Sequence, residues 1–134
     1  MARKVLFTAT VSEHIRSFHI PYLKWFKERG YEVHVAANGT SEIDYCDSFF
    51  DVPFERSPFK RSNILAYRKL TELLSVNKYD LIHCHTPVGG VVTRLAARAS
   101  RLEGARVLYT AHGFHFYRGA KAMNWLVFFP IEKW

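Results

Sequence analysis

The repeated alternation of short apolar runs with helical segments is the feature that most constrains how this chain can fold. Residues 4–10 read KVLFTAT, a continuous run of apolar and β-branched side chains without the alternation expected of a strand with one face in solvent. Such a run is typical of a parallel strand that is covered on both faces. Comparable runs occupy residues 32–37, 80–85 and 105–110, and a helical segment precedes each of them. The pattern predicts an α/β fold, a doubly wound parallel sheet with helices on both faces.

The first helical segment contains a proline that limits where a helix can run. Apolar side chains recur there at helical spacing, at Ile15, Phe18, Tyr22 and Phe26. The segment closes with Arg29 and Gly30, a basic last turn followed by a C-cap glycine. Because Pro21 lies inside the pattern, we expect the helix to kink there or to begin close to it.

Two further helices and a short strand complete the expected order of elements. Residues 49–54 could form a short strand that ends at Pro53. Ser62 is expected to cap a helix. The apolar face expected for that helix consists of Ile64, Leu65, Tyr67, Leu70, Leu73 and Leu74. The next helix follows Gly89 and Gly90, and its apolar positions are Leu95, Ala96 and Ala99.

Composition and charge limit the class of protein but do not identify its binding partner. The chain has 134 residues, of which 49% are hydrophobic and 23% charged, as in an ordinary globular domain. The longest uncharged stretch, residues 81–93, is shorter than the roughly 20 residues of a membrane-spanning helix. The apolar run at the start is too short for a signal peptide, and Cys46 and Cys84 are expected to be free thiols. These features predict a cytoplasmic protein, and the net charge of +7 suits an anionic partner.

Polar residues follow three of the predicted strands, where the carboxyl ends of parallel strands form a ligand-binding edge. The expected substrate-binding residues at this edge are Thr10, Ser12, Glu13, His14, His85, Thr86, Gly113 and His115. His112, next to Gly113 just beyond a strand, is expected to have a role in this site, because loops at this edge carry function. His83 is either part of this site or a hydrogen-bonded core residue.

Two sequence patterns at the same edge can be explained by structure alone as well as by ligand binding. Gly89 and Gly90 open a helix, so their N–H groups could bind a phosphate and we include them among the substrate-binding candidates. Close packing of that helix against a strand explains the two glycines equally well. The pairs His83-x-His85 and His112-x-x-His115 have ligand-like spacing, yet no acidic residue stands near them in sequence. We therefore predict no metal site.

Basic residues form two groups along the chain. Arg94, Arg98 and Arg101 are spaced to form one stripe along a helix. A second group surrounds Phe59 and consists of Arg56, Lys60, Arg61, Arg68 and Lys69. Either group could be a solvated face, and together they favour contact with an anionic membrane surface. No nucleic-acid-binding motif is present, so nucleic acid is not an expected partner.

The motifs together resemble the opening of bacterial exopolysaccharide and capsular-polysaccharide glycosyltransferases. The similarity covers nearly the whole chain and lies in residues 4–10, 17–23, 30–36, 56–59, 83–90 and 109–116. The two histidine-containing motifs, HCHTPVGG and YTAHGFHF, are its most specific part.

The resemblance implies a fold of two Rossmann-like domains that face each other across a cleft, the glycosyltransferase-B architecture. Residues 1–134 would be part of the N-terminal, acceptor-side domain, and the C-terminal domain that binds the nucleotide-sugar would be absent. The implied activity is retaining transfer of a hexose from a nucleotide-sugar, most simply a UDP-sugar, to a lipid-linked saccharide acceptor. Residues 10–14 would border the acceptor, and His112 would lie near the transferred sugar as the catalytic residue. This chain would bind no cofactor of its own.

The last residues of the chain suggest an incomplete domain, and the sequence is also compatible with two other functions. Residues 120–134 read as a helix with an uncovered apolar surface, which is typical of an incomplete domain and could mediate association of copies. On this view the chain alone is inactive. An alternative is a non-catalytic α/β module that binds a phosphate-bearing ligand or regulator at Gly89 and Gly90. A histidine-rich metal hydrolase is a third.

Overall fold

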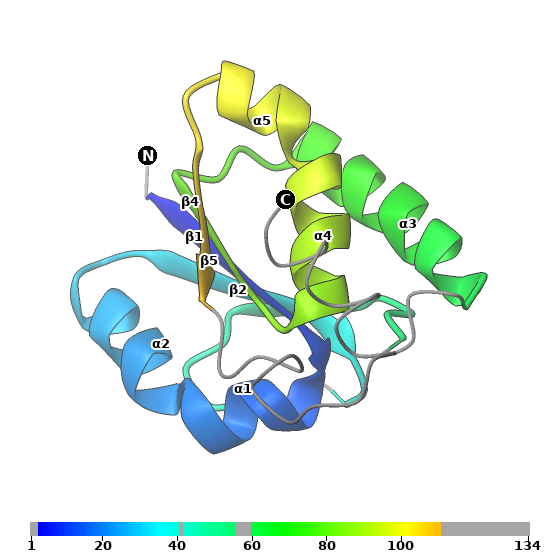
Figure 1. The fold of residues 1–134 in the computed structure, drawn as a ribbon. Coiled ribbons are helices and arrows are strands. Elements are labelled where there is room, and N and C mark those ends of the chain that lie inside the picture. Colours follow the sequence, from blue (N-terminus) through cyan, green and yellow to red (C-terminus); the bar gives the residue numbers. More distant parts are fainter. Residues whose placement is uncertain (1–2, 41, 56–59, 111–134) are drawn as a thin grey trace, which may run out of the picture.

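The structure is a single parallel sheet with helices on both faces. This computed structural model describes residues 3–40, 42–55 and 60–110. The elements in chain order are β1 (Lys4–Val11), α1 (Ser12–Phe18), α2 (Ile20–Glu28), β2 (Glu32–Asn38), β3 (Ser48–Asp51), α3 (Ser62–Val76), β4 (Leu81–His85), α4 (Pro87–Ala96), α5 (Arg98–Leu102) and β5 (Arg106–Thr110). The sheet has the order β3-β2-β1-β4-β5, and every neighbouring pair is parallel (Figure 1). The predicted doubly wound fold is confirmed.

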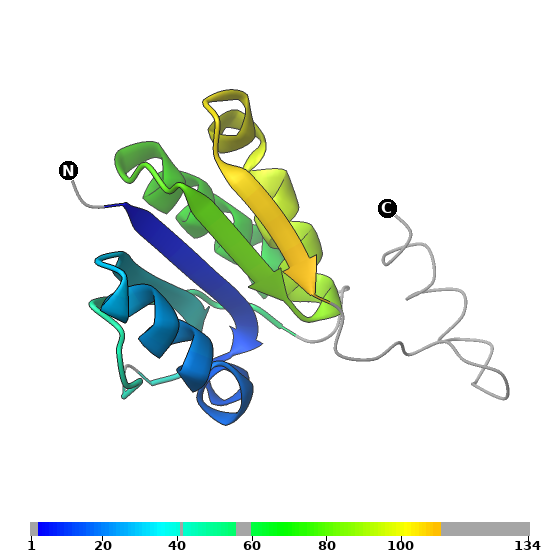
Figure 2. The same cartoon turned by 90° about the vertical axis from the view of Figure 1, so that its left-hand side faces the viewer.

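Strand β1 lies at the centre and separates two apolar cores. Val5, Phe7 and Ala9 pack with Ile15 and Leu23 on the face covered by α1 and α2. The intervening residue Leu6 packs on the opposite face, under α3 and α4. Figure 2 shows the two blue helices on one side of the sheet and the green and yellow helices on the other. Because both faces are covered, β1 has no solvent side, which explains why its residues from Val5 to Val11 are apolar or β-branched.

The first helical segment is two helices with a break at His19. His19 has φ −117° and ψ −2°, and it ends α1 and precedes α2. Pro21 lies in the first turn of α2, where its missing N–H costs no helical hydrogen bond. The second of the two expectations, that a helix begins close to Pro21, is thus confirmed. Gly30 has φ +83°, as expected for a glycine just after a helix end.

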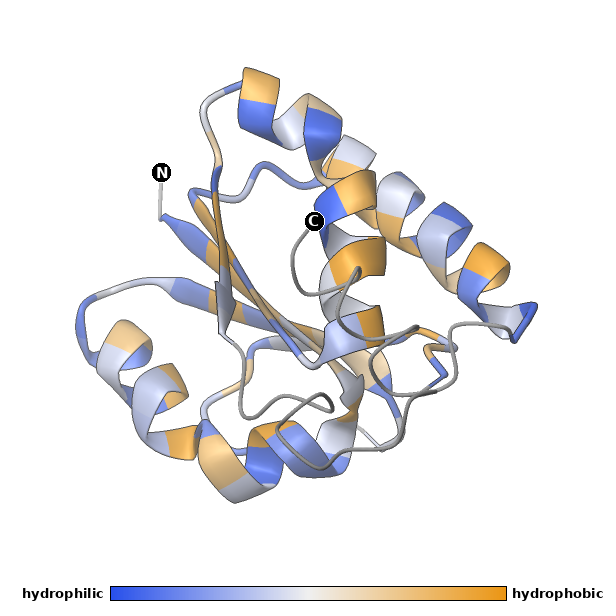
Figure 3. Cartoon of the chain, viewed as in Figure 1, coloured by the Kyte–Doolittle hydropathy of each residue, from blue (hydrophilic) through white to orange (hydrophobic). Residues whose placement is uncertain are grey.

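Helix α3 differs from the prediction in its cap and in its buried face. Ser62 is the first helical residue, and the N-cap is Arg61, whose side chain makes no cap hydrogen bond. The buried apolar positions are Ala66, Leu70, Leu73 and Leu74. Ile64, Leu65 and Tyr67 are instead exposed, and Figure 3 shows apolar residues on the uncovered start of this helix. The small residue Ala66 allows the helix to approach the sheet, and this rotates the larger side chains outward.

The helix predicted after Gly89 and Gly90 is divided at Ala97 into α4 and α5. Arg94 therefore lies on a different helix from Arg98 and Arg101, and the single basic stripe expected from the sequence does not form. The Arg94 Nε donates to the carbonyl of Gly90 at 3.0 Å, and its guanidinium lies over the ring of Tyr109 at 4.8 Å from the centroid. Arg94 is thus a packing residue. Within the described part of the chain, no helix is long and apolar enough to cross a membrane.

The orientation of α3 can be tested by truncating one buried and one exposed leucine on that helix. Leu70 is fully buried and Leu65 is 58% exposed. Leu70→Ala should lower the free energy of unfolding by about 2–5 kcal/mol, because it removes buried surface and leaves a cavity. Leu65→Ala is the matched control and should change it by less than about 0.5 kcal/mol. Urea unfolding followed by circular dichroism measures both; equal effects would contradict this orientation.

Candidate functional site

The carboxyl ends of β1, β4 and β5 meet at the point where the chain changes direction across the sheet. β1 pairs with β4 up to Thr8 and Cys84, and β4 pairs with β5 up to His85 and Thr110. Beyond these pairs, the hydroxyls of Thr10 and Thr86 lie 2.7 Å apart, and the Thr10 N–H donates to Thr86 Oγ1 at 3.3 Å. The structure therefore brings two of the predicted site residues together at the edge where doubly wound folds bind ligands.

Thr86 has a backbone conformation that few residues other than glycine adopt. Its φ is +68° and its ψ is 147°, directly before the first residue of α4. Such a conformation costs about 1–3 kcal/mol and persists only where surrounding contacts enforce it. Here the Thr86 hydroxyl bonds to Thr10 and to the carbonyl of His85. Strain of this kind clusters at functional sites, and the sequence pattern gave no sign of it.

Gly89 and Gly90 allow α4 to pack closely on β1 and β5. A Cβ on Gly89 would lie 2.8 Å from Thr86 Oγ1, and one on Gly90 would lie 2.7 Å from the ring of Tyr109. The Gly90 N–H already donates to the carbonyl of Thr86 at 2.8 Å. A buried bond between Thr8 and Thr93 at 2.8 Å ties the same helix to β1. These contacts favour the packing interpretation of the two glycines over a phosphate-binding one.

Ser12 and Glu13 have surroundings that separate them from this edge. Ser12 is buried, and its Oγ accepts from the N–H of Thr40 at 3.2 Å, which holds the loop after β2. The Glu13 side chain is 80% exposed and forms an ion pair with Arg16 at 3.3 Å. Ser12 thus has a structural contact and Glu13 faces solvent, so neither is placed with Thr10 and Thr86.

Four histidines gather beside the threonine pair, on the face covered by α1 and α2. The ring of His85 lies 4.1 Å from that of His83, 5.9 Å from His14 and 3.8 Å from His19, between centroids. Phe7 stacks on His85 at 6.0 Å with an interplanar angle of 10°. His83 and His85 share one face, as their spacing predicted, and His83 Nε2 also bonds to Thr110 Oγ1 at 2.6 Å. His83 is therefore both hydrogen-bonded and part of the cluster.

His19 is the member of this cluster that sequence reasoning missed. Its side chain is 2% exposed and its centroid lies 5.0 Å from that of His14. The available signal was Pro21, because a helix that starts near this proline requires a break just before it. That break places His19 at the carboxyl edge of β1 instead of on a helix surface.

His112, Gly113 and His115 lie outside the described residues, as do residues 120–134. The described chain reaches Thr110 at the carboxyl end of β5, in register with His85. The expected roles of His112, Gly113 and His115 therefore stay predictions.

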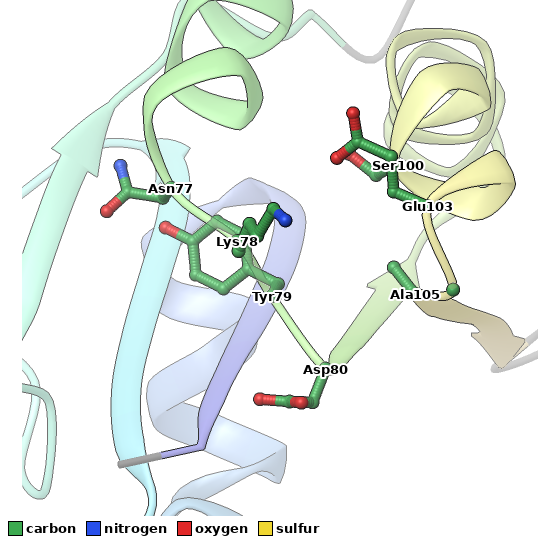
Figure 4. Close-up of a pocket in the computed structure, with 8 residues that line it drawn as sticks. Asn77, Lys78, Tyr79, Asp80, Ser100, Glu103 and Ala105 are labelled. Atoms are coloured by element: carbon green, nitrogen blue, oxygen red, sulfur yellow. The ribbon is translucent and has the colours of Figure 1, made fainter. Parts of the chain in front are cut away.

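Two surface hollows lie away from the histidine cluster. Figure 4 shows one of about 130 Å³ at the amino ends of β4 and β5, where Asp80 and Glu103 contribute to the lining. This is the end of a parallel sheet opposite to the usual ligand edge. The second hollow has a volume of about 440 Å³ and lies beside the end of β2, between Asn38 and the α3 residues Leu65 and Arg68. Only the second hollow is close to the carboxyl edge.

The sheet order, the all-parallel pairing and the helices on both faces define a Rossmann-like α/β domain. Residues 4–134 match the model of the glycosyl transferase 4-like family, and the chain belongs to that family. Over its whole length it is 55% identical to the Bacillus subtilis (strain 168) protein named "Putative glycosyltransferase EpsD". The chain spans 35% of the length of that relative. The resemblance expected from the sequence motifs is confirmed.

Solved structures with low sequence identity share the fold. UDP-N-acetylglucosamine 2-epimerase from Rickettsia bellii matches with a TM-score of 0.66 and 14% identity, over 99% of this chain and 37% of the epimerase. MurG from Acinetobacter baumannii matches with a TM-score of 0.60 and 15% identity, over 93% of this chain and 39% of MurG. These matches support the Rossmann-like architecture alone.

The thiols of the two cysteines, Cys84 buried and Cys46 half-buried, are predicted to react slowly in the folded chain. Both are free, and burial raises the pKa of Cys84 to about 12 and that of Cys46 to about 11. Since the thiolate is the reactive form, both should react with a disulfide reagent such as Ellman's reagent far more slowly than a free thiol at pH 8. Unfolding in urea should restore fast reaction of both. Rapid labelling of the folded chain would contradict the burial of these thiols.

Proposed function

We propose that this chain is the acceptor-side part of a retaining hexosyltransferase that takes a sugar from a UDP-sugar. The acceptor is a lipid-linked saccharide in exopolysaccharide or capsule synthesis. Family membership carries this proposal, and the name of the 55% identical relative supports it. The chain spans 35% of that relative, so the nucleotide-sugar would bind to a second domain of the complete enzyme.

The carboxyl edge supplies groups suited to hold a sugar acceptor. Thr86 contributes a partly exposed hydroxyl, which the buried hydroxyl of Thr10 holds in place and which can donate to or accept from a sugar hydroxyl group. Their positions are fixed by β1, by β4 and by the strained turn into α4. A preorganised polar edge of this kind binds a ligand without first having to order its side chains. In the proposed mechanism this domain orients the acceptor, and His112 stabilises charge that develops on the transferred sugar.

The catalytic part of this proposal is tested in the complete enzyme with labelled UDP-sugars and membrane-extracted acceptor. His112→Ala should lower kcat by at least about 30-fold, which corresponds to roughly 2 kcal/mol of lost transition-state stabilisation. Glu103→Ala, at the opposite end of the sheet, is the control and should leave kcat unchanged. Wild-type turnover of the His112 variant would remove this residue from the mechanism. Analysis of the product by NMR would show whether the anomeric configuration is retained.

We also propose that the exposed face of α3 contacts the anionic inner surface of the cell membrane, where a lipid-linked acceptor resides. This face combines the exposed apolar residues Ile64, Leu65 and Tyr67 with the exposed basic residues Lys60, Arg61, Arg68 and Lys69. Apolar side chains flanked by cations are typical of surfaces that bind anionic lipids. Leu65 and Arg68 also line the hollow beside β2, so the face adjoins the carboxyl edge of the sheet.

Sedimentation with lipid vesicles tests the membrane contact. Wild-type protein should bind vesicles that contain phosphatidylglycerol, and Leu65→Glu combined with Arg68→Glu should reduce binding at least tenfold. Arg98→Glu combined with Arg101→Gln is the matched control, because it changes the net charge by the same amount and these exposed arginines lie on α5, away from the proposed face. Equal loss in both double variants would indicate attraction by net charge alone and would contradict a specific role for α3.

A further inference from the structure

Three histidines from three different parts of the chain bring ring nitrogens close together. His14 lies on α1, His19 lies in the break between α1 and α2, and His85 is the last residue of β4. One ring nitrogen of each can be chosen so that all three lie within 4.8 Å of one another. His19 and His85 are buried and His14 is partly exposed, and the Nε2 atoms of all three rings are buried.

Imidazole nitrogen is a good ligand for divalent transition metals of the zinc type. In a tetrahedral site with metal–nitrogen bonds of about 2.0–2.1 Å, the nitrogens lie roughly 3.4 Å apart. The observed nitrogens therefore need to approach by little more than an ångström, which side-chain rotation can supply. The rings of His19 and His85 stack at 3.8 Å and 30°, so one of them must turn to aim its nitrogen at a shared ion.

The backbone positions of the three residues are already fixed. His85 is held by parallel pairing of β4 with β5, and its ring rests on Phe7. His19 is held by its N–H, which donates to the carbonyl of Ile15 at 2.9 Å, and by its carbonyl, which accepts from Leu23 at 3.0 Å. A site whose ligands stand on rigid elements needs only side-chain adjustment to bind a metal.

We propose that His14, His19 and His85 bind one divalent transition-metal ion of the zinc type. Three protein ligands leave a fourth position of a tetrahedral ion for water or for an anionic ligand. The ligand set is uncharged, and the carboxylate nearest in sequence, Glu13, forms an ion pair with Arg16. The bound ion would keep its positive charge at the carboxyl edge of the sheet, next to Thr86.

This inference departs from the expectation of no metal site, and it does not depend on the proposed sugar transfer. The expectation of no metal site rested on the pairs His83-x-His85 and His112-x-x-His115, which lack a neighbouring acidic residue. In the structure, a different set of possible ligands lies close together, namely His85 with His14 and His19. An acidic ligand is dispensable in such a set, because three imidazoles alone hold zinc in known sites.

Binding of cobalt and zinc to the purified chain tests the site without an activity measurement. The chain is stripped with a chelator and titrated with Co²⁺, whose tetrahedral complexes absorb visible light strongly. We expect a visible spectrum that saturates at one Co²⁺ per chain, is displaced by Zn²⁺, and is accompanied by a higher melting temperature. A wild-type chain that retains no metal after gel filtration would overturn the proposal.

Variants then locate the ion. His14→Asn is the main variant, because His14 is partly exposed and the substitution should leave the fold intact. It should weaken Co²⁺ binding at least tenfold and abolish the tetrahedral spectrum, and His19→Asn should do the same. His34→Gln is the matched control, since His34 is buried elsewhere, between Tyr79 and Glu32 at 2.7 Å each. Unchanged binding in the His14 variant, or equal loss in a folded His34 variant, would refute the assignment.

Discussion

The burial of β1 on both faces is the constraint on which the rest of this structure depends. Its odd-numbered residues Val5 and Phe7 fill one core, and Leu6 fills the other. A strand buried in this way must lie at the centre of the sheet, with β2 on one side and β4 on the other. The chain therefore changes direction between β1 and β4, and that change opens the carboxyl edge at Thr10.

Two local departures from regular structure turn this edge into a candidate site. The break between α1 and α2 brings His19 inward, where a continuous helix would have carried it past the sheet. The positive φ of Thr86 turns the chain sharply from β4 into α4 and directs its hydroxyl to Thr10. Both departures are enforced by tertiary contacts, and each places a polar side chain where two layers of the fold meet.

The sequence predicts the order and type of the strands well, because a parallel strand covered on both faces carries an unmistakable apolar run. It predicts the face of α3 poorly. Leu65 and Leu70 both satisfy helical spacing with other apolar residues, and only contact with the sheet decides which of them is buried. The sequence likewise does not reveal why residue 90 is a glycine. A Cβ there would clash with the ring of Tyr109, which lies on a strand that comes later in the chain.

The position of a site residue in the sequence likewise predicts some of its contacts and not others. Thr10 and Thr86 could be expected to meet, because Thr10 lies near the carboxyl end of β1, Thr86 directly follows that of β4, and a doubly wound sheet places these strands side by side. Ser12 and Glu13 follow the same strand, yet they lie on the first turn of α1, and helical geometry directs them to the β2 loop and to solvent. A residue must therefore lie near a strand end to join Thr10 and Thr86, but that position alone does not bring its side chain to them.

The adjacent residues His85 and Thr86 join the two halves of the candidate site. His85 faces the layer of α1 and α2, where it stacks on Phe7 and His19. Thr86 faces α4 and bonds to Thr10 across the sheet. The candidate site therefore joins a cluster of imidazole rings on one face of the sheet to a pair of bonded threonine hydroxyls on the other.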